Sequence, residues 1–390
     1  MDDLPYPDFS DYFEALERWA PHMQGEAPIA LEFSRGCWWG QRSQCVFCGL
    51  NCQSIAYRRK SARRAEEEIK TLTDRYRVNK VILSDSILDM SYFKTLLPAL
   101  AEWGKLEELF LEARINLTRE QVGLLRAAGV THFQPGIESL DSEMLALMGK
   151  GTTLLQNLQF LKWAREYGLQ PTWNLLYGFP RENPEAYARM ASLIPAITHL
   201  TPPMDVIPVL LVRFSPLFEH SQDHGVKNPK AHRGYRAVYP FAQEDLDGLA
   251  YFFDYQSEER RDLAAFIKPL KHQVKVWRQN WEQGRPPLLT FDARSNGEIV
   301  IYDSRPGSQN PQVILNGLPA LVHSACETIQ DFDRLAAAVR EQMGAAYVGD
   351  AVVGDAIDGL LRDGLLVNEG DRFLSLASRP IQIQEVSEEW

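Results

Sequence analysis

Four of the chain's five cysteines lie close together, in the stretch SRGCWWGQRSQCVFCGLNC at residues 34–52. They are Cys37, Cys45, Cys48 and Cys52, whereas Cys326 lies far along the chain. Cysteines at this density could form a disulfide-bonded loop, bind a structural zinc ion or hold an iron–sulfur cluster. Each alternative implies a different class of protein.

The spacing Cys-x7-Cys-x2-Cys favours the iron–sulfur alternative. The acidic, aromatic N-terminal segment lacks the features of a secretory signal, so we expect a cytoplasmic location and reduced thiols. Structural zinc sites usually draw on two separated cysteine pairs, whereas one compact loop carries these thiols. Three thiolates on a 4Fe–4S cluster leave one iron without a protein ligand, and that iron can bind a cofactor.

The composition is that of an ordinary globular protein. The 390 residues are 45% hydrophobic and 24% charged, which suits one large domain and a smaller one. No apolar run approaches the roughly 20 residues that span a bilayer. The net charge of −11 disfavours nucleic acid, because phosphate contacts need a basic surface. We therefore expect neither a nucleic-acid nor a membrane partner.

Strand-like segments alternate with helical patterns through the first half of the chain. The segments are 27–34, 80–86, 106–114, 130–139, 169–180 and 204–214. Strict alternation predicts an α/β fold with a parallel sheet, either an open doubly wound sheet or an incomplete TIM-like barrel. In both, chemistry takes place at the carboxyl ends of the strands.

Polar residues collect at these predicted strand ends, and the cysteine loop leaves the first of them. They are Asp85, Ser86, Glu112, Arg114, Asn116, Gln134, Glu138, Ser139, Asn174 and Arg213. We therefore expect them to share one face with the thiols.

Four segments follow from these patterns: an N-terminal segment (1–26), a β/α core (27–215), a loop and helical extension (216–287) and a C-terminal module (288–390). The extension is predicted as loop over 215–240, with a long helix over 257–284. The module is predicted to have a hairpin turning at Asn296-Gly297, helices near 314–328, 330–343 and 350–363, and a last strand pair. This order resembles a winged helix.

Six stretches together resemble the radical S-adenosylmethionine (SAM) superfamily. They are SRGCWWGQRSQCVFCGLN (34–51), ILDMSYFKTLLPAL (87–100), GVTHFQPGIESL (129–140), LMGKGTT (147–153), WNLLYGFPRENP (173–184) and RFSPLFE (213–219). More narrowly, the chain resembles enzymes that mature ribosomally made peptides (RiPPs) and are related to cobalamin-dependent peptide C-methyltransferases. The resemblance covers nearly the whole chain and implies a partial (β/α)6 barrel.

The sequence departs from that family in two ways. The family's usual cysteine spacing is C-x3-C-x2-C, and the loop here is longer. The relatives usually carry a cobalamin-binding domain before the barrel, and this sequence starts where that domain would be ending. The domain could be absent by nature, could have been cut off, or could be supplied by a separate cobalamin-binding chain, and methylation through cobalamin depends on which of these holds.

The resemblance implies a mechanism and its partners. Cys37, Cys45 and Cys48 would hold the 4Fe–4S cluster, and SAM would bind its open iron. An electron donor such as flavodoxin or ferredoxin would reduce the cluster, the C5′–S bond would break, and the 5′-deoxyadenosyl radical would remove a hydrogen atom from a precursor peptide. Cys52 would be a free thiol near the cluster. No acid or base residue is assigned.

Ten residues are implied contacts of SAM, and five of them also have a structural alternative. Asp85 and Ser86 are implied to contact the methionyl amino group, and Glu112 and Arg114 its carboxylate and the ribose. Gln134, Glu138 and Ser139 are implied to contact the ribose, and Lys150 a carboxylate. Asn174 is implied to contact the cofactor, and Phe47 the edge of the adenine. The structural alternatives are a helix cap for Asp85, mutual pairing of Glu112 and Arg114, a solvated Lys150, and a plug at the barrel mouth for Phe47.

Other functions stay open at this point. A peptide epimerase, cross-linking enzyme or oxidase would need no cobalamin, and the mass of the product distinguishes these from a methyltransferase. A tRNA-modifying radical enzyme is disfavoured by the charge of −11. A zinc-stabilised, non-catalytic peptide-binding protein is the third alternative. The C-terminal module could hold the leader segment of a precursor by strand addition, or act as a lid on the barrel.

Overall fold

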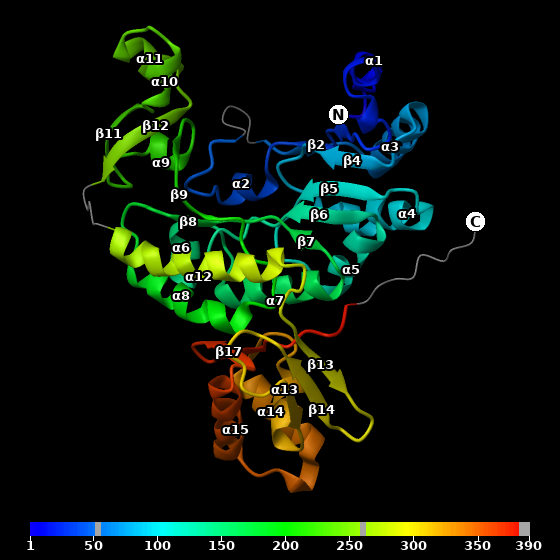
Figure 1. Ribbon diagram of the computed structural model, residues 1–390, viewed down its shortest axis with the longest axis vertical. Coiled ribbons are helices and arrows are strands. Elements are labelled where there is room, and N and C mark those ends of the chain that lie inside the picture. The colour runs from blue at the N-terminus through cyan, green and yellow to red at the C-terminus, as the bar shows by residue number, and fades with distance from the viewer. Residues whose placement is uncertain (51–55, 258–262, 382–390) are drawn as a thin grey trace.

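The structure is a computed structural model that describes residues 1–50, 56–257 and 263–381. Its largest sheet is parallel throughout and has the strand order β1-β4-β5-β6-β7 (Figure 1). The strands are β1 (Ile29–Leu31), β4 (Lys80–Leu83), β5 (Glu108–Glu112), β6 (Val130–Gln134) and β7 (Gln170–Pro171). The predicted parallel α/β fold is confirmed.

A second parallel pair continues the barrel. It consists of β8 (Leu175–Tyr177) and β9 (Val206–Pro208). The Leu176 N–H donates to the carbonyl of Glu138 at 2.9 Å and so joins this pair to the loop after β6. The predicted strand 169–180 is therefore two strands, β7 and β8, with residues 172–174 between them.

Helices cover the outside of the barrel and begin where the sequence supplies caps. They are α3 (Ala62–Tyr76), α4 (Leu96–Trp103), α5 (Arg119–Ala127), α6 (Ser142–Leu147), α7 (Leu154–Glu166) and α8 (Glu185–Ile197). Capping boxes start α5 at Thr118 and α7 at Thr153, each with a glutamine three residues later. The long helix α12 (Ala264–Glu282) packs on α8 and buries Ile267, Leu270, Val274 and Trp277.

The N-terminal segment and several short elements complete this half. They are α1 (Ser10–Trp19), η1 (Pro21–Met23), the antiparallel pair β2 (Ser34–Arg35) and β3 (Arg58–Arg59), α2 (Trp38–Arg42) and η2 (Met90–Lys94). Phe13 stacks on Tyr76 of α3 with ring centroids 5.0 Å apart, which holds α1 against the barrel. Within the described ranges, no helix has the length and apolarity that crossing a membrane requires.

The extension contains a sheet where the sequence predicts a loop. Strand β12 (Phe252–Ser257) pairs with β10 (Leu211–Val212) on one side and β11 (Val226–Ala231) on the other. Helices α9 (Pro216–Glu219), α10 (Gly234–Val238) and α11 (Gln243–Leu249) lie between these strands in sequence. The loop prediction is wrong because β11 contains Pro229 and shifts register between Lys227 and Lys230, so it lacks a local strand pattern and depends on β12.

In the part of the chain that the structure describes, the C-terminal module has two three-stranded antiparallel sheets and three α-helices. The elements are β13 (Leu289–Ala293), β14 (Ile299–Asp303), β15 (Gln312–Leu315), α13 (Leu318–Ala325), β16 (Gln330–Asp331), α14 (Phe332–Met343), η3 (Gly344–Ala346), α15 (Asp350–Arg362), β17 (Leu366–Glu369) and β18 (Arg372–Ser375). The predicted hairpin and last strand pair are confirmed. Residues 314–317 are not helical, because β15 pairs with β14.

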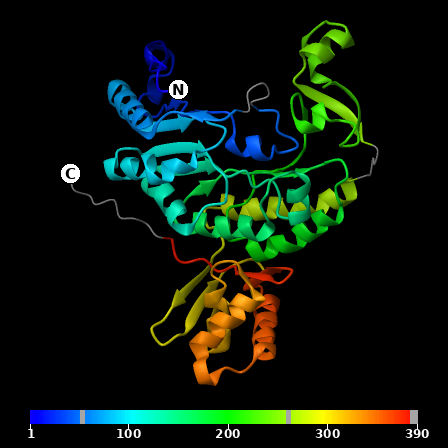
Figure 2. The ribbon, with the colours of Figure 1, turned by 180° about the vertical axis from the view of Figure 1, so that it is seen from behind.

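Figures 1 and 2 place this module at the end of the molecule opposite α2, with the barrel helices between them. Buried polar groups join it to the barrel: the Lys162 ammonium donates to the backbone carbonyl of Ser375, and the Arg305 guanidinium donates to the carbonyl of Ala196 at 2.6 Å. Since α2 carries the cysteine loop, the module does not form a lid over that loop.

Candidate active site

Most of the predicted cofactor residues surround one cavity of about 170 Å³. The cavity lies where the chain leaves the carboxyl ends of β1, β4, β5 and β6. The predicted residues that line it are Cys37, Cys45, Phe47, Cys48, Ser86, Glu112, Arg114, Gln134, Glu138 and Lys150. Four successive strand ends thus bring together side chains that are far apart in sequence, as parallel β/α folds require. What each side chain contacts in a bound cofactor stays a prediction.

Backbone contacts hold the cysteine loop against the barrel. The Val46 N–H donates to the carbonyl of Met148 at 3.0 Å, and the Val46 carbonyl accepts from the Leu217 N–H at 2.9 Å. A Cβ atom at Gly49 would lie 2.3 Å from the backbone oxygen of Arg213, so only glycine fits this approach. The loop is therefore fastened to two later parts of the chain.

The thiols surround the cavity without meeting at one point. Cys37, Cys45 and Cys48 all line it, yet no three Cys, His, Asp or Glu side chains in the described part of the chain come close enough to hold a single metal ion. A multi-iron cluster needs this wider arrangement because each thiolate bonds a different iron. Burial raises the pKa of the Cys45 and Cys48 thiols, so bound metal is what would keep them as thiolates. Cys52 lies outside the described residues.

Trp39 and Arg114 form one wall of the cavity. The Arg114 guanidinium carbon lies 3.8 Å from the centre of the Trp39 ring, and Arg114 also donates to the carbonyl of Lys150. Gly151, with φ of +64°, makes room for that ring, since a Cβ there would lie 2.5 Å from Trp39 Cη2. The buried Nε of Arg114 has no hydrogen-bond partner among the described residues. An acceptor from a ligand, such as a carboxylate, would satisfy it.

The lining also carries acids and one amine. The Lys150 ammonium lies 3.6 Å from a Glu138 oxygen, and Lys150 is only 7% exposed, so it is not a solvated loop lysine. Burial, reinforced by the charge of Glu138, raises the pKa of Glu112 to about 7. The cavity thus offers both cations and carboxylates, which suits a zwitterionic ligand such as SAM.

Three predicted contacts lie elsewhere. Asp85 does not line the cavity: its carboxylate accepts from the Phe33 N–H at 2.7 Å and from the Ser34 hydroxyl at 2.9 Å. Ser139 is fully buried, and its hydroxyl accepts from the Asp141 N–H at 3.2 Å. Asn174 is half-buried and lines neither this cavity nor the larger one described next. The geometry gives Asp85 and Ser139 structural partners, and their cofactor contacts stay predictions.

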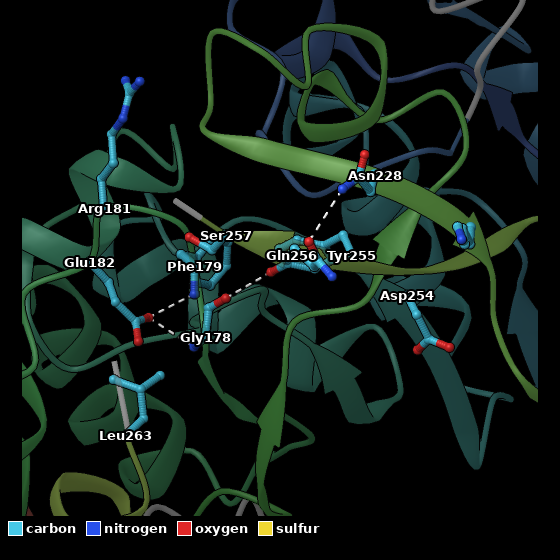
Figure 3. A pocket seen from close by; sticks show the side chains of 11 residues that line it. Gly178, Phe179, Arg181, Glu182, Asn228, Asp254, Tyr255, Gln256, Ser257 and Leu263 are labelled. Atoms are coloured by element: carbon cyan, nitrogen blue, oxygen red, sulfur yellow. Dashed lines mark hydrogen bonds between the residues drawn. The ribbon is translucent and has the colours of Figure 1, made fainter. Parts of the chain in front are cut away.

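Phe47 joins this cavity to a larger one. Its ring packs edge to face on Phe179, with centroids 5.9 Å apart, and Phe179 lines a cavity of about 710 Å³. The loop after β8 forms one side of the larger cavity, and β11 and β12 form the other (Figure 3). Sequence reasoning missed Phe179 and Glu182. The sequence signal for these two residues was GFPRE (178–182), in which a glycine and a glutamate lie at the end of a predicted strand.

Residues 31–194, which include the cysteine loop and every strand end around the smaller cavity, match the protein family described as the radical SAM superfamily. This segment is a radical SAM domain. The family implies SAM and a 4Fe–4S cluster, and the three thiols around one cavity, with the unpaired Arg114 Nε beside them, fit those groups.

Three known proteins are similar to this chain. A protein of Pyrococcus horikoshii described as an uncharacterized methyltransferase is 29% identical over 156 residues, which are 39% of this chain and 33% of that protein. The cobalamin-dependent SAM radical enzyme OxsB, solved with aqua-cobalamin and SAM, aligns with 94% of this chain at 13% identity and a TM-score of 0.50. The radical SAM methyltransferase TsrM from Kitasatospora setae aligns with 65% at 16% identity and a TM-score of 0.49.

This chain spans only part of these relatives. It covers 54% of OxsB, 52% of TsrM and 33% of the Pyrococcus protein. The OxsB likeness supports the fold of the chain and leaves its substrate open.

Proposed function

We propose that this cytoplasmic enzyme holds a 4Fe–4S cluster through Cys37, Cys45 and Cys48 and cleaves SAM reductively to modify a ribosomally synthesised peptide. C-methylation is the proposed outcome where cobalamin is supplied. The observation that carries the proposal is the convergence of three separate thiols on one cavity whose wall contains an unpaired arginine nitrogen.

The residues of the smaller cavity would divide the binding of SAM among them. Arg114, which lies over the Trp39 ring, would donate from Nε to the methionyl carboxylate. Glu112 and Glu138 would accept from the amino and ribose hydroxyl groups, and Lys150 would hold Glu138 in place. Phe47, which lines the cavity, would pack against the adenine.

The bound cluster, reduced by a donor such as flavodoxin or ferredoxin, would supply the electron that breaks the C5′–S bond of SAM. The chain's own contribution is to orient the two partners and to exclude water. Trp39 and Phe47 line the cavity beside the thiols, and the Met148 and Leu217 backbone contacts keep the loop closed over it.

Two observations support the methyl-transfer outcome. One relative is described as a methyltransferase, and OxsB, which shares the fold, is described as cobalamin-dependent. A separate cobalamin-binding chain would supply that group. The edge strand β15, whose Ile314 is 49% exposed, is the place where we propose that the C-terminal module adds the leader segment of the precursor as a strand.

The first experiment measures iron and sulfide in anaerobically reconstituted protein, with an absorption spectrum, for the wild type and for Cys37→Ala, Cys45→Ala and Cys48→Ala. We expect about four iron atoms per wild-type chain and a broad absorption that dithionite bleaches, both reduced in each variant. Cys326→Ala is the matched control because Cys326 is buried away from the cavity and should keep full iron content. One zinc per chain and no such absorption would refute the proposal.

The second experiment identifies the reaction. The reduced enzyme is incubated with SAM and candidate precursor peptides, with and without cobalamin, and the products are analysed by mass spectrometry. A gain of one methylene that requires cobalamin supports C-methylation. An unchanged mass, or the loss of two hydrogens, with 5′-deoxyadenosine formed in either case, would instead identify an epimerase, a cross-linking enzyme or an oxidase.

A further inference from the structure

One residue that lines the smaller cavity has a strained backbone. Glu138 has φ of +62°, in the left-handed region that few residues other than glycine adopt. Such a conformation costs free energy and persists only where the surrounding structure enforces it. The two neighbours of Glu138, Ile137 and Ser139, are fully buried, while the Glu138 side chain lies at the cavity. The turn therefore needs contacts that keep Glu138 in this conformation.

The side chain of Asn157, on α7, supplies contacts of this kind. Its Nδ2 donates to the Ser139 carbonyl at 2.8 Å and, at the longer distance of 3.4 Å, to the Ile137 carbonyl. These two carbonyls belong to the residues on either side of Glu138. The capping box at Thr153 fixes the start of α7, and the Asn157 N–H donates to the Thr153 carbonyl at 3.1 Å. One amide group on a well-anchored helix thus spans the strained residue.

Asn157 is a costly residue for the core. It is fully buried, and nearby positions of α7 hold the buried apolar residues Leu155, Leu158 and Phe160. Its Oδ1 is also buried and has no hydrogen-bond partner among the described residues. A buried oxygen without a partner loses its hydration and gains nothing in return. The value of this amide therefore lies in the turn that its NH₂ group holds.

The turn directs the Glu138 carboxylate to the cavity. One carboxylate oxygen lies 3.6 Å from the Lys150 ammonium, and the Glu138 carbonyl accepts from the Leu176 N–H at 2.9 Å. Because both neighbours of Glu138 are buried in the core, a change of its φ would swing the side chain relative to them. The carboxylate would then leave Lys150 and the cavity. Small displacements of a binding group are enough to weaken the binding of a ligand.

We propose that Asn157 is a positioning residue of the SAM site: by bonding the carbonyls on both sides of Glu138, it holds this glutamate in the conformation from which its carboxylate accepts from a ribose hydroxyl of SAM. This inference rests on the proposed function and adds to it a residue that does not itself line the cavity. Asn157 acts through Glu138 and contacts neither SAM nor the cluster.

The test measures the Kd for SAM by equilibrium binding to reconstituted Asn157→Leu, because leucine has a similar volume and no donor. Gln159→Met is the matched control: Gln159 lies on the same helix, and its Oε1 accepts from the Ile329 N–H of the C-terminal module at 2.8 Å. Each substitution removes one side-chain amide that bonds to the backbone. We expect the Kd to rise about tenfold in Asn157→Leu and less than about twofold in Gln159→Met, with iron content unchanged in both.

A double-mutant cycle distinguishes positioning from a general structural role. In a Glu138→Ala background the carboxylate is gone, so adding Asn157→Leu should change the Kd less than about twofold. A tenfold effect of Asn157→Leu that persists without the Glu138 carboxylate would overturn the inference. An unchanged Kd in Asn157→Leu alone would overturn it as well.

Deoxy forms of SAM provide a second readout. The wild type should bind the 2′-deoxy or the 3′-deoxy form about tenfold more weakly than SAM, because a hydrogen bond to Glu138 is lost. Asn157→Leu should bind that form and SAM equally, whereas Gln159→Met should discriminate as the wild type does. Equal binding of SAM and both deoxy forms by the wild type would refute the inference.

If Asn157→Leu does not fold, a crystal structure of the wild type with SAM decides. A Glu138 oxygen at hydrogen-bond distance from a ribose hydroxyl, with the bond from Asn157 to Ser139 kept, supports the inference, and the absence of either refutes it. The wild type also separates the two proposals. If it holds no cluster or binds no SAM, the proposed function fails. If it does both and Asn157→Leu binds SAM normally, only the role of Asn157 fails.

Discussion

The Arg114 guanidinium lies over the Trp39 ring, with its carbon 3.8 Å from the ring centre, and Gly151 makes room for the ring. A flat cation on an aromatic face is held in one orientation, so its unpaired Nε points in a defined direction. The geometry therefore prepares this nitrogen for an acceptor before any ligand binds.

Arg114→Lys should weaken SAM binding. Lysine keeps the charge but lacks the planar guanidinium over the ring and the fixed Nε donor, which together should contribute about 1–3 kcal/mol to the binding free energy of SAM. We expect the Kd for SAM to rise about 10- to 100-fold with iron content unchanged, as measured by equilibrium binding to reconstituted protein. Arg42→Lys, at the exposed end of α2, is the control and should bind SAM normally. An unchanged Kd in Arg114→Lys would remove Arg114 from the site.

Gly49→Ala should impair assembly of the cysteine loop. A methyl group there would lie 2.3 Å from the backbone oxygen of Arg213, which is not a flexible side chain that could move away. We expect a loss of about 1–3 kcal/mol in the free energy of unfolding and a lower iron content after reconstitution. Gly354→Ala is the matched control because nothing lies within 4 Å of the added atom in helix α15. Full iron content in Gly49→Ala would contradict the close packing of this loop.

Asp85→Asn and Ser86→Ala should have different effects although the residues are adjacent. Asp85 accepts two hydrogen bonds from Phe33 and Ser34 in a buried position, so replacing an oxygen by an NH₂ group should cost about 1–3 kcal/mol of stability. Ser86 lines the cavity, so Ser86→Ala should mainly weaken SAM binding. Thermal unfolding and SAM titration of both variants would test this. A pure affinity defect in Asp85→Asn would restore its predicted role at the cofactor.

Lys162 should make stability depend on pH above neutrality. Burial lowers its pKa from 10.5 to about 8 in the folded protein, partly offset by the charges of Glu166 and Glu327. Between about pH 8 and 10.5 the unfolded chain therefore binds more protons at this residue, and the free energy of unfolding rises with pH. The expected gain is about 3 kcal/mol, because each pKa unit corresponds to about 1.4 kcal/mol.

Urea unfolding of the wild type and Lys162→Met across this pH range would measure that gain, because other titrating groups cancel in the difference. Lys162 joins α7 to the carbonyls of Ser375 and Glu327, so the effect also reports on the seam between the barrel and the C-terminal module. A difference between the two proteins that does not vary with pH would show that the amine stays charged when buried.

Much of the secondary structure of this protein can be predicted from its sequence, because it depends on short-range interactions. Strand and helix alternation, the capping threonines Thr118 and Thr153 and the turn at Asn296-Gly297 depend on neighbours a few residues away, and the structure has each of them. The cysteine spacing and the polar strand ends likewise predict one face with thiols and charged groups, because parallel strands bring their carboxyl ends together.

The tertiary structure alone decides which polar groups face the cavity and which hold the fold together. Asp85 and Arg114 both follow strands, yet Asp85 is bonded to Phe33 and to Ser34 of β2, whereas Arg114 is left with an unpaired Nε. That difference depends on the positions of Ser34 and Trp39, which local sequence does not specify. The cavity around Glu182 depends in the same way on β11, which is a strand because it pairs with β12. Pro229 and the shift in register leave β11 without a local strand pattern in the sequence. Sequence determines the residues that reach the barrel mouth, and long-range packing determines which of them remain available to a ligand.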